Sequence, residues 1–523
     1  MKHLLERIGG FIPFLVALTL PVLSLPIASD SYILPRASIV IAGACLGIGL
    51  AVLIPSGPRL GALRLPLVAA AAAALLAFVF SISWPLSIAG SFTRYESLPM
   101  RLGYLGLAAS AVWLLRTKLQ QEAVGAGFVV GTSIVAFKAW LQWFNHAPFR
   151  PDGDLGNANL LAALIVMAIP IAIDRGRRSS YLTPAWAVAI VVMLAGLVVT
   201  TSRSGALGLL AAMLTVITLS LPPRLVRVAA GLSVAALGAA VVFILVSPLR
   251  ALNDDPPQLR LHLWQDALRM IGARPVTGWG EETTGLAFGQ FLSQDYAGLV
   301  TFDRVHSGVL EIAATQGLVG LAALTWVLAV IALAAWRGRL QPGVAGLAGG
   351  LAGYSVWVFF NFDWAPATGP FWLLAGTLWS FFPRSPGKVA PREAPGRMGG
   401  KIWQPALASA LALAAVILAV FPVLADVWYL RGRADLSIRV DPLQAQYHWA
   451  LGQNLVAGKD LPGGIAELQR AADLGETDPA LYVELGDREV QAGRMDDARG
   501  AYRRALEIDP YYSPARQRLA TTG

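Results

Sequence analysis

Three side chains that could act together lie far apart in the chain. Arg203 and His306 each open a long apolar segment, and Arg260 lies in the more polar stretch that precedes the second of these segments. The guanidinium group of arginine binds phosphate oxygens through two N–H groups at once and keeps its charge near neutral pH. The imidazole of histidine can accept a proton in the same pH range. If the fold brings them together where the outer face of the membrane meets water, these three residues suit a diphosphate ligand.

The local sequence around each residue predicts where it lies. Arg203, in Thr201-Ser-Arg-Ser-Gly205, opens an apolar segment, and the N-terminus of a helix there would favour an anion. Arg260 precedes Trp264 in a stretch typical of an amphipathic helix, and His306 opens the next apolar segment. All three residues are therefore expected where the outer face of the membrane meets water.

Each of these residues also has a simpler interpretation. An arginine at a membrane interface can extend its charged end to water, and a histidine at a helix start can be a cap or a surface residue. Arg94 can bind phosphate or be an ordinary loop arginine. Asn157 and Asn159 precede an apolar segment, where asparagine more often caps a helix than contacts a ligand.

Two pairs of adjacent carboxylates, Asp254-Asp255 and Glu281-Glu282, could suggest a metal site. Adjacent carboxylates in loops usually face water, so we expect no metal site and no metal cofactor. Gly278-x-Gly280 lacks the surrounding βαβ unit that a dinucleotide site requires. The lone cysteine, Cys45, rules out a disulfide framework within the chain.

The elements that must position these residues are membrane helices. The chain is 56% hydrophobic and only 14% charged, and apolar runs of about 17–25 residues, the length that crosses a bilayer, recur along most of it. The runs are continuous rather than alternating, which indicates helices and not a barrel. The sequence thus predicts an all-α fold, a polytopic membrane bundle of about 12–13 helices.

The net charge of +9 is distributed as in a membrane protein. From residue 426 onward the chain has more acidic than basic residues, so the basic excess lies in the membrane part. Much of that excess falls in short loops on one face, which predicts a cytoplasmic N-terminus in the inner (plasma) membrane and argues against nucleic acid as a partner. The longest outer loop, residues 247–305, is expected to be functional.

A polar tail follows the last span, so we divide the chain into a membrane domain, residues 1–425, and a tail, residues 426–523. Gly452 and Gly486 stand in similar contexts 34 residues apart, which is the tetratricopeptide period. The topology predicts that this repeat module lies outside the cytoplasm. Such surfaces bind proteins, and a protein partner of the tail is therefore possible.

Several motifs, taken in order, resemble the O-antigen ligase/polymerase superfamily. They are Ser202-Arg203-Ser-Gly205, Arg260-x3-Trp264, Pro275-Val-Thr-Gly-Trp-Gly280, His306-Ser-Gly-Val-Leu310 and Gln316-Gly-Leu-Val-Gly320. Arg94-Tyr95-Glu-Ser-Leu98 and Gly156-Asn157-Ala-Asn159 resemble the longer members, some of which end in tetratricopeptide repeats. Each motif is weak alone, and their order and spacing carry the resemblance.

The resemblance implies a metal-independent transfer at the outer face of the membrane, without a cofactor. A glycan would leave a polyprenyl-diphosphate carrier and join an acceptor hydroxyl on a lipid, a glycan or a protein. Arg203 and Arg260 would hold the departing diphosphate, and His306 would orient or deprotonate the acceptor. The candidates for substrate contact are Arg94, Tyr95, Asn157, Asn159 and Trp264. Ser307 and Gln316 depart from the family pattern, in which Asn and Glu are frequent, and leave the acceptor class open.

Three other functions fit the same sequence. A polymerase of the superfamily would lengthen lipid-linked repeat units, and a ladder of products on the carrier would distinguish it from a ligase. A transporter of inorganic carbon or another small solute would place ionisable residues near the middle of the bilayer, where the predicted spans have few. An inactive scaffold would use only the repeats to recruit partners.

Overall fold

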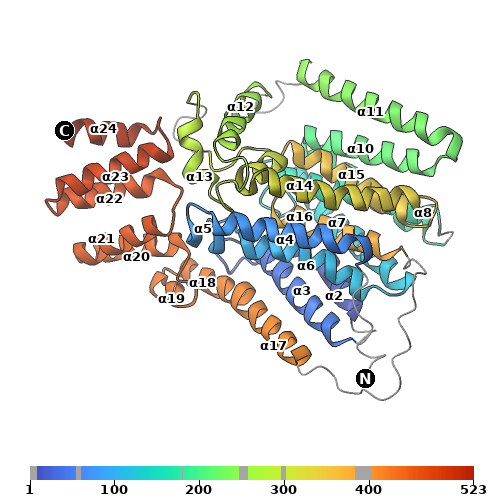
Figure 1. Cartoon of the computed structure of the whole chain (residues 1–523), viewed down its shortest axis with the longest axis horizontal. Helices are drawn as coiled ribbons and strands as arrows, with labels where there is room; N and C mark the ends of the chain where they lie inside the picture. The colour runs from blue at the N-terminus through green and yellow to red at the C-terminus, as the bar shows by residue number, and fades with distance from the viewer. Residues whose placement is uncertain are drawn as a thin grey trace.

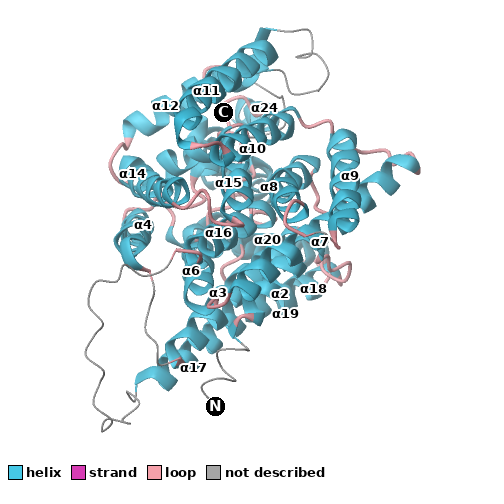
Figure 2. Cartoon of the chain, turned by 90° about the vertical axis from the view of Figure 1, so that its right-hand side faces the viewer, coloured by secondary structure: helices cyan, strands magenta, loops and turns pink. Residues whose placement is uncertain are grey.

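The computed structural model describes residues 9–54, 60–179, 181–246, 257–295, 302–382 and 403–522. These residues form helices joined by loops, and no strand occurs among them (Figure 2). Nine of the described helices are long and apolar enough to cross a membrane. The all-α prediction is confirmed, and the chain is a multi-pass membrane protein.

The nine long helical segments follow the predicted spans. They are α3 (Ile33–Leu53), η1 with α4 (Gly61–Val79), α7 (Lys118–Phe144), α8 (Ala158–Gly176), α9 (Thr183–Thr200), α10 (Arg203–Ser220), α11 (Pro223–Val246), α14 (Gly308–Arg337) and α17 with η4 and α18 (Trp403–Leu430). Shorter helices pack with them: α2 (Phe11–Val22), α6 (Leu98–Leu114), α15 (Val344–Phe359) and α16 (Ala365–Ser380).

Two helices begin earlier than the hydrophobic pattern predicts. The apolar runs alone predict that these two spans start near residues 37 and 102, whereas α3 starts at Ile33 and α6 at Leu98. Arg36 and Arg101 therefore lie inside the first turns of these helices, and both are buried. A buried arginine is tolerated when its N–H groups find acceptors, and Arg36 donates to the carbonyls of Leu20 and Pro21, each at 3.0 Å.

Small residues let α10 and α15 pack closely and in opposite directions. A Cβ atom on Gly353 would lie 2.7 Å from the carbonyl oxygen of Gly208, and one on Gly349 would lie 2.9 Å from that of Ala212. Glycine removes the side chain that would keep two such backbones apart. The start of α10 therefore lies at the end of α15 that reaches Phe359.

A kink in α14 joins two of the sequence motifs. Gly317 adopts φ 68° and ψ −172°, a conformation open only to glycine, and the helix changes direction there. The kink frees carbonyl groups of α14, so that Trp279 N–H donates to Ala314 and Gly280 N–H donates to Thr315, each at 2.9 Å. Leu318 N–H donates in return to the carbonyl of Pro275 at 2.7 Å. Residues 275–280 are thereby fixed to α14.

The tail lies at one end of the bundle, beside helices that connect the long spans (Figure 1). It consists of α19 (Ala434–Val440), α20 (Ala445–Ala457), α21 (Leu461–Asp473), α22 (Pro479–Gln491), α23 (Met495–Ile508) and α24 (Ser513–Thr522). The same end of the bundle carries α5 (Trp84–Ala89), α12 (Pro257–Ala273), α13 (Thr284–Ala287) and η3 (Phe288–Phe291). The tail core includes Leu86 of α5 and Leu286 of α13.

Candidate functional site

The loop between α15 and α16, residues 360–364, is the centre of the candidate site. Arg260 of α12 donates a hydrogen bond to the carbonyl of Phe360. The N–H of Gly308, the first residue of α14, donates to the carbonyl of Asn361 at 2.7 Å. This short loop therefore connects the amphipathic helix, the start of α14 and the ends of α15 and α16.

His306 lies just before α14 and packs between two aromatic rings. Its backbone has a φ of 54°, which is uncommon for a residue with a side chain. The imidazole centroid lies 5.6 Å from the ring of Phe302 and 5.6 Å from that of Phe362. Ser307 then caps α14 by accepting a hydrogen bond from the N–H of Leu310. The cap fixes the backbone on which His306 stands.

Arg94 also contacts Phe362, and it pairs with Asp303. Its Nε and Nη2 atoms donate to the two carboxylate oxygens of Asp303 at 2.8 and 3.1 Å. The guanidinium group stacks on Phe362 and Trp364, at 5.1 and 4.4 Å from their ring centroids. Desolvation opposes the charge on Asp303, but Arg94 and Arg304 outweigh it and hold the pKa of that carboxyl below its ordinary value.

Trp264 reaches the same loop from α12, whereas Tyr95 faces the junction with the tail. The Trp264 ring packs against Phe359 and Phe360, at centroid distances of 5.4 and 6.0 Å. Tyr95 is buried and packs edge-on against Phe92 at 6.2 Å. Burial raises the pKa of the Tyr95 phenol well above its usual range. Tyr95 thus adjoins Arg94 in sequence but packs into the protein core.

Arg203 belongs to a second polar group, at the starts of α8 and α10. It is the first residue of α10, and Ser202 before it caps that helix. The Ser202 hydroxyl also donates to Oδ1 of Asn159 at 2.8 Å. Asn157 accepts from the N–H of Asn159 at 2.8 Å, so the prediction that Asn157 caps a helix is confirmed. Arg150, which the sequence did not single out, donates to the carbonyl of Thr200 beside this group.

The two groups lie at the same end of α15. Trp357, near that end, lies against Gly208, about one turn along α10 from Arg203, and Phe360, just beyond it, accepts the hydrogen bond from Arg260. Arg260, His306, Arg94 and Trp264 are thus arranged around one loop, and Arg203, Asn157 and Asn159 occupy the neighbouring helix starts.

A buried ion-pair network beneath the loop was missed by the sequence analysis. Asp363 pairs with Arg101 and lies 3.7 Å from Arg304. Arg101 also pairs with Glu281 at 3.0 Å, and Arg304 pairs with Glu282. All five side chains are at most 8% exposed. The sequence contained two signals of this network. Arg101 stands in the first turn of an apolar helix, and Asp363 stands within an aromatic stretch.

The prediction that Glu281 and Glu282 face water is wrong. Both carboxylates are buried because the backbone hydrogen bonds between residues 275–280 and α14 hold this segment against the bundle. Glu281 also accepts a hydrogen bond from Gln316 at 2.6 Å. Among the described residues no group of histidine, cysteine, aspartate and glutamate is arranged to hold a metal, and Asp254 and Asp255 lie outside those residues.

Glu96 supplies a fourth carboxyl group to the network, beside those of Glu281, Glu282 and Asp363. It is fully buried and accepts a hydrogen bond from the Tyr104 hydroxyl at 2.5 Å. Arg101 lies 3.7 Å away but pairs more closely with Glu281 and Asp363. Burial raises the pKa of Glu96 to about 8, so this side chain is mostly protonated at neutral pH.

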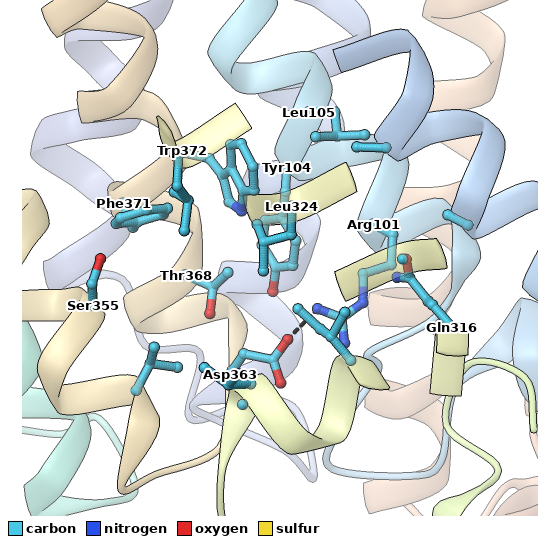
Figure 3. A pocket seen from close by; sticks show the side chains of 18 of the residues that line it. Arg101, Tyr104, Leu105, Gln316, Leu324, Ser355, Asp363, Thr368, Phe371 and Trp372 are labelled. Carbon is cyan, nitrogen blue, oxygen red and sulfur yellow. Dashed lines mark hydrogen bonds and ion pairs between the residues drawn. The ribbon is translucent and has the colours of Figure 1, made fainter. Parts of the chain in front are cut away.

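An apolar cavity of about 180 Å³ adjoins the network (Figure 3). Arg101 and Asp363 are joined at its polar end, and Phe371, Trp372 and Leu324 line it further along. A second cavity of about 380 Å³ shares Leu328, Ser355 and Phe371 with the first. The two cavities therefore follow one another between α14, α15 and α16.

Residues 188–325 match the family model described as O-antigen ligase. This part of the chain is therefore similar to O-antigen ligases. The matched segment contains Arg203, Arg260, Trp264 and His306, and the match supports a glycosyl-transferring activity of the ligase or polymerase type. Residues 479–522 match a tetratricopeptide repeat model, as the repeat spacing predicted. No match was found among curated proteins.

Proposed function

We propose that this protein transfers a glycan from a polyprenyl-diphosphate carrier to an acceptor hydroxyl at the outer face of the inner membrane. The observation that carries the proposal is the arrangement of Arg260 and His306, both in the segment similar to O-antigen ligases, around the loop of residues 360–364. Arg203 starts α10 at the same end of α15. These residues belong to three segments that are distant in sequence.

The roles follow from the chemistry of each group. The oxygen of the acceptor attacks the anomeric carbon of the glycan, and its proton passes to His306. The bond between that carbon and the phosphate oxygen breaks, and the polyprenyl diphosphate leaves with the electron pair. Arg203 and Arg260 stabilise the negative charge that grows on the leaving group, which is the interaction that speeds a reaction. Arg94 and Trp264 contact the substrates at the edge of the site.

The cavities support a lipid-linked donor. The first cavity is mostly lined by apolar side chains and has an ion pair at one end, as a ligand with a charged head and a hydrocarbon chain requires. The second continues it along α14 and is lined by residues such as Leu219, Ile331 and Leu378. A prenyl chain is proposed to lie along this path, with its diphosphate at the outer end.

Alanine substitutions of Arg203, Arg260 and His306 test the proposal. Each purified variant is expected to lose at least about 100-fold in transfer from a lipid-linked donor, because positioned acid–base and charge-stabilising groups contribute about 10²–10³-fold each. His262→Ala, an exposed histidine of α12, and Arg224→Ala, an exposed arginine of α11, are matched controls that should retain turnover. Size-exclusion elution and melting temperature check the fold.

The products decide between the two transfer reactions. A single block on a new acceptor indicates a ligase, whereas a ladder of lengths on the carrier lipid indicates a polymerase. Wild-type turnover in all three alanine variants would remove these residues from the mechanism. A wild-type protein that transfers nothing to any lipid, glycan or protein acceptor would contradict the proposed function.

A further inference from the structure

The segment of residues 281–291 lies between the candidate site and the repeat tail. On the site side, Glu281 pairs with Arg101, and Glu282 pairs with Arg304. Thr284 donates a hydrogen bond to the buried carboxyl of Glu311 at 2.5 Å, in the first turn of α14. The segment therefore contacts both arginines of the network and the helix that follows His306.

On its other side the same segment is packed directly against the tail. A Cβ atom on Gly289 would lie 2.0 Å from the carbonyl oxygen of Ile508, so two backbones touch where no side chain fits. A Cβ atom on Gly285 would lie 2.9 Å from Cβ of Thr477 and 3.4 Å from Cβ of Asp303. The backbone of Gly285 thus lies between Thr477 of the tail and Asp303, which pairs with Arg94.

A second outer segment, residues 83–97, is held by the tail in the same way. Gln444 donates to the carbonyl of Gly90 at 3.3 Å, and Tyr447 packs against Phe92 at a centroid distance of 6.0 Å. Leu86 is buried within the tail core. This segment contains Arg94 and Glu96, so two of the segments that supply charged groups to the site contact the tail.

We infer that the repeat tail positions the ion pairs of the site, acting through Gly289 and Gly285; the inference rests on the proposed function. α13 and η3 have only four residues each, and single turns of helix are unstable without tertiary contacts. Buried ion pairs are favourable only in a fixed geometry. The tail supplies that constraint from outside the membrane, and a partner bound to the tail would act on the site by the same route.

Gly289→Leu in the full-length chain tests the inference, with Gly289→Ala as a milder variant. The control is Gly500→Leu, an exposed position on α23 with no atom near its Cβ position. Hydrogen exchange without substrate is expected to rise in residues 281–291 and 304–311 of the Gly289 variants only. Turnover of the lipid-linked donor should fall at least about tenfold in kcat, because a displacement of about 1 Å can cost 10²-fold.

The two measurements separate the possible outcomes. Unchanged exchange in residues 281–311 of both Gly289 variants overturns the inference, and so does faster exchange with an unchanged kcat. An equal loss of kcat in Gly500→Leu also overturns it. If the wild-type protein shows no turnover, the proposed function fails, and the exchange comparison still decides whether the tail holds the segment.

Discussion

At the residue scale, the ion pairs around Asp363 depend on how many carboxylates are charged. Two arginines, Arg101 and Arg304, share Glu281, Glu282 and Asp363, and all of these side chains are buried. A further charged carboxylate would lack a compensating cation in a region of low dielectric. Burial raises the pKa of Glu96 against the attraction of Arg101, and the protonated form adds no further negative charge to the network.

Glu96→Gln is expected to remove a pH dependence of stability. The folded-state pKa of about 8 lies above the ordinary value of 4.5, so the folded protein binds the proton more tightly than the unfolded chain. This contribution to stability is fully present below pH 4.5 and is lost as the pH rises through 8. The contribution of Glu96 to the wild-type melting temperature should therefore fall between pH 6 and 8 and level off above pH 8, and the variant should lose that fall.

Glu507→Gln, which replaces an exposed glutamate of α23, serves as the control and should follow the wild-type curve. Glutamine keeps an acceptor for the Tyr104 hydroxyl, so the comparison isolates the charge. If the melting temperatures of Glu96→Gln and the wild-type protein change in parallel from pH 6 to 9, protonation of Glu96 does not contribute to stability.

At the scale of elements, one glycine determines how α14 meets the segment of residues 275–282. The kink at Gly317 turns backbone carbonyls toward Trp279 and Gly280, and a Cβ atom on Gly317 would lie 2.2 Å from the carbonyl oxygen of Val276. Glu281 and Glu282 follow immediately, so the kink fixes where these carboxylates enter the bundle. The helix geometry therefore decides the contacts of the ion-pair network.

Gly317→Ala should lower the melting temperature and weaken turnover. The added methyl group meets backbone and the conformation is open only to glycine, which costs about 1–3 kcal/mol. Gly272→Ala in α12 is the control, since no atom lies near its Cβ position and alanine favours a helix by up to about 1 kcal/mol. A Gly317→Ala protein as stable as the Gly272→Ala protein would contradict this account of the kink.

At the scale of the whole molecule, the tail and the helices α5, α12 and α13 gather at one end of the bundle (Figure 1). The ion-pair network, the loop of residues 360–364 and the first turn of α14 lie at that same end. If the basic loops at the opposite end face the cytoplasm, as the charge distribution predicts, the whole candidate site lies outside it. A donor that faces outward would then meet the site and the tail together.

Cysteine labelling tests this orientation, because Cys45 is the only cysteine in the chain. In a Cys45→Ala background, Gly500→Cys in the tail should react with a membrane-impermeant maleimide in cells whose outer layers have been removed. Gln341→Cys, in the loop between α14 and α15, should react only after the membrane is permeabilised. The reverse pattern would invert the proposed topology.

The sequence by itself determined the membrane helices, the repeat tail and the positions of Arg203, Arg260 and His306 near helix ends, because hydrophobicity, charge and repeat spacing are properties of neighbouring residues. Only the tertiary structure decided that Glu281 and Glu282 turn inward, that Arg101 and Arg304 share Asp363, and that the tail touches the segment beside them. These contacts join residues up to 262 positions apart. Their geometry depends on a helix kink and on close backbone packing, and no local pattern encodes it.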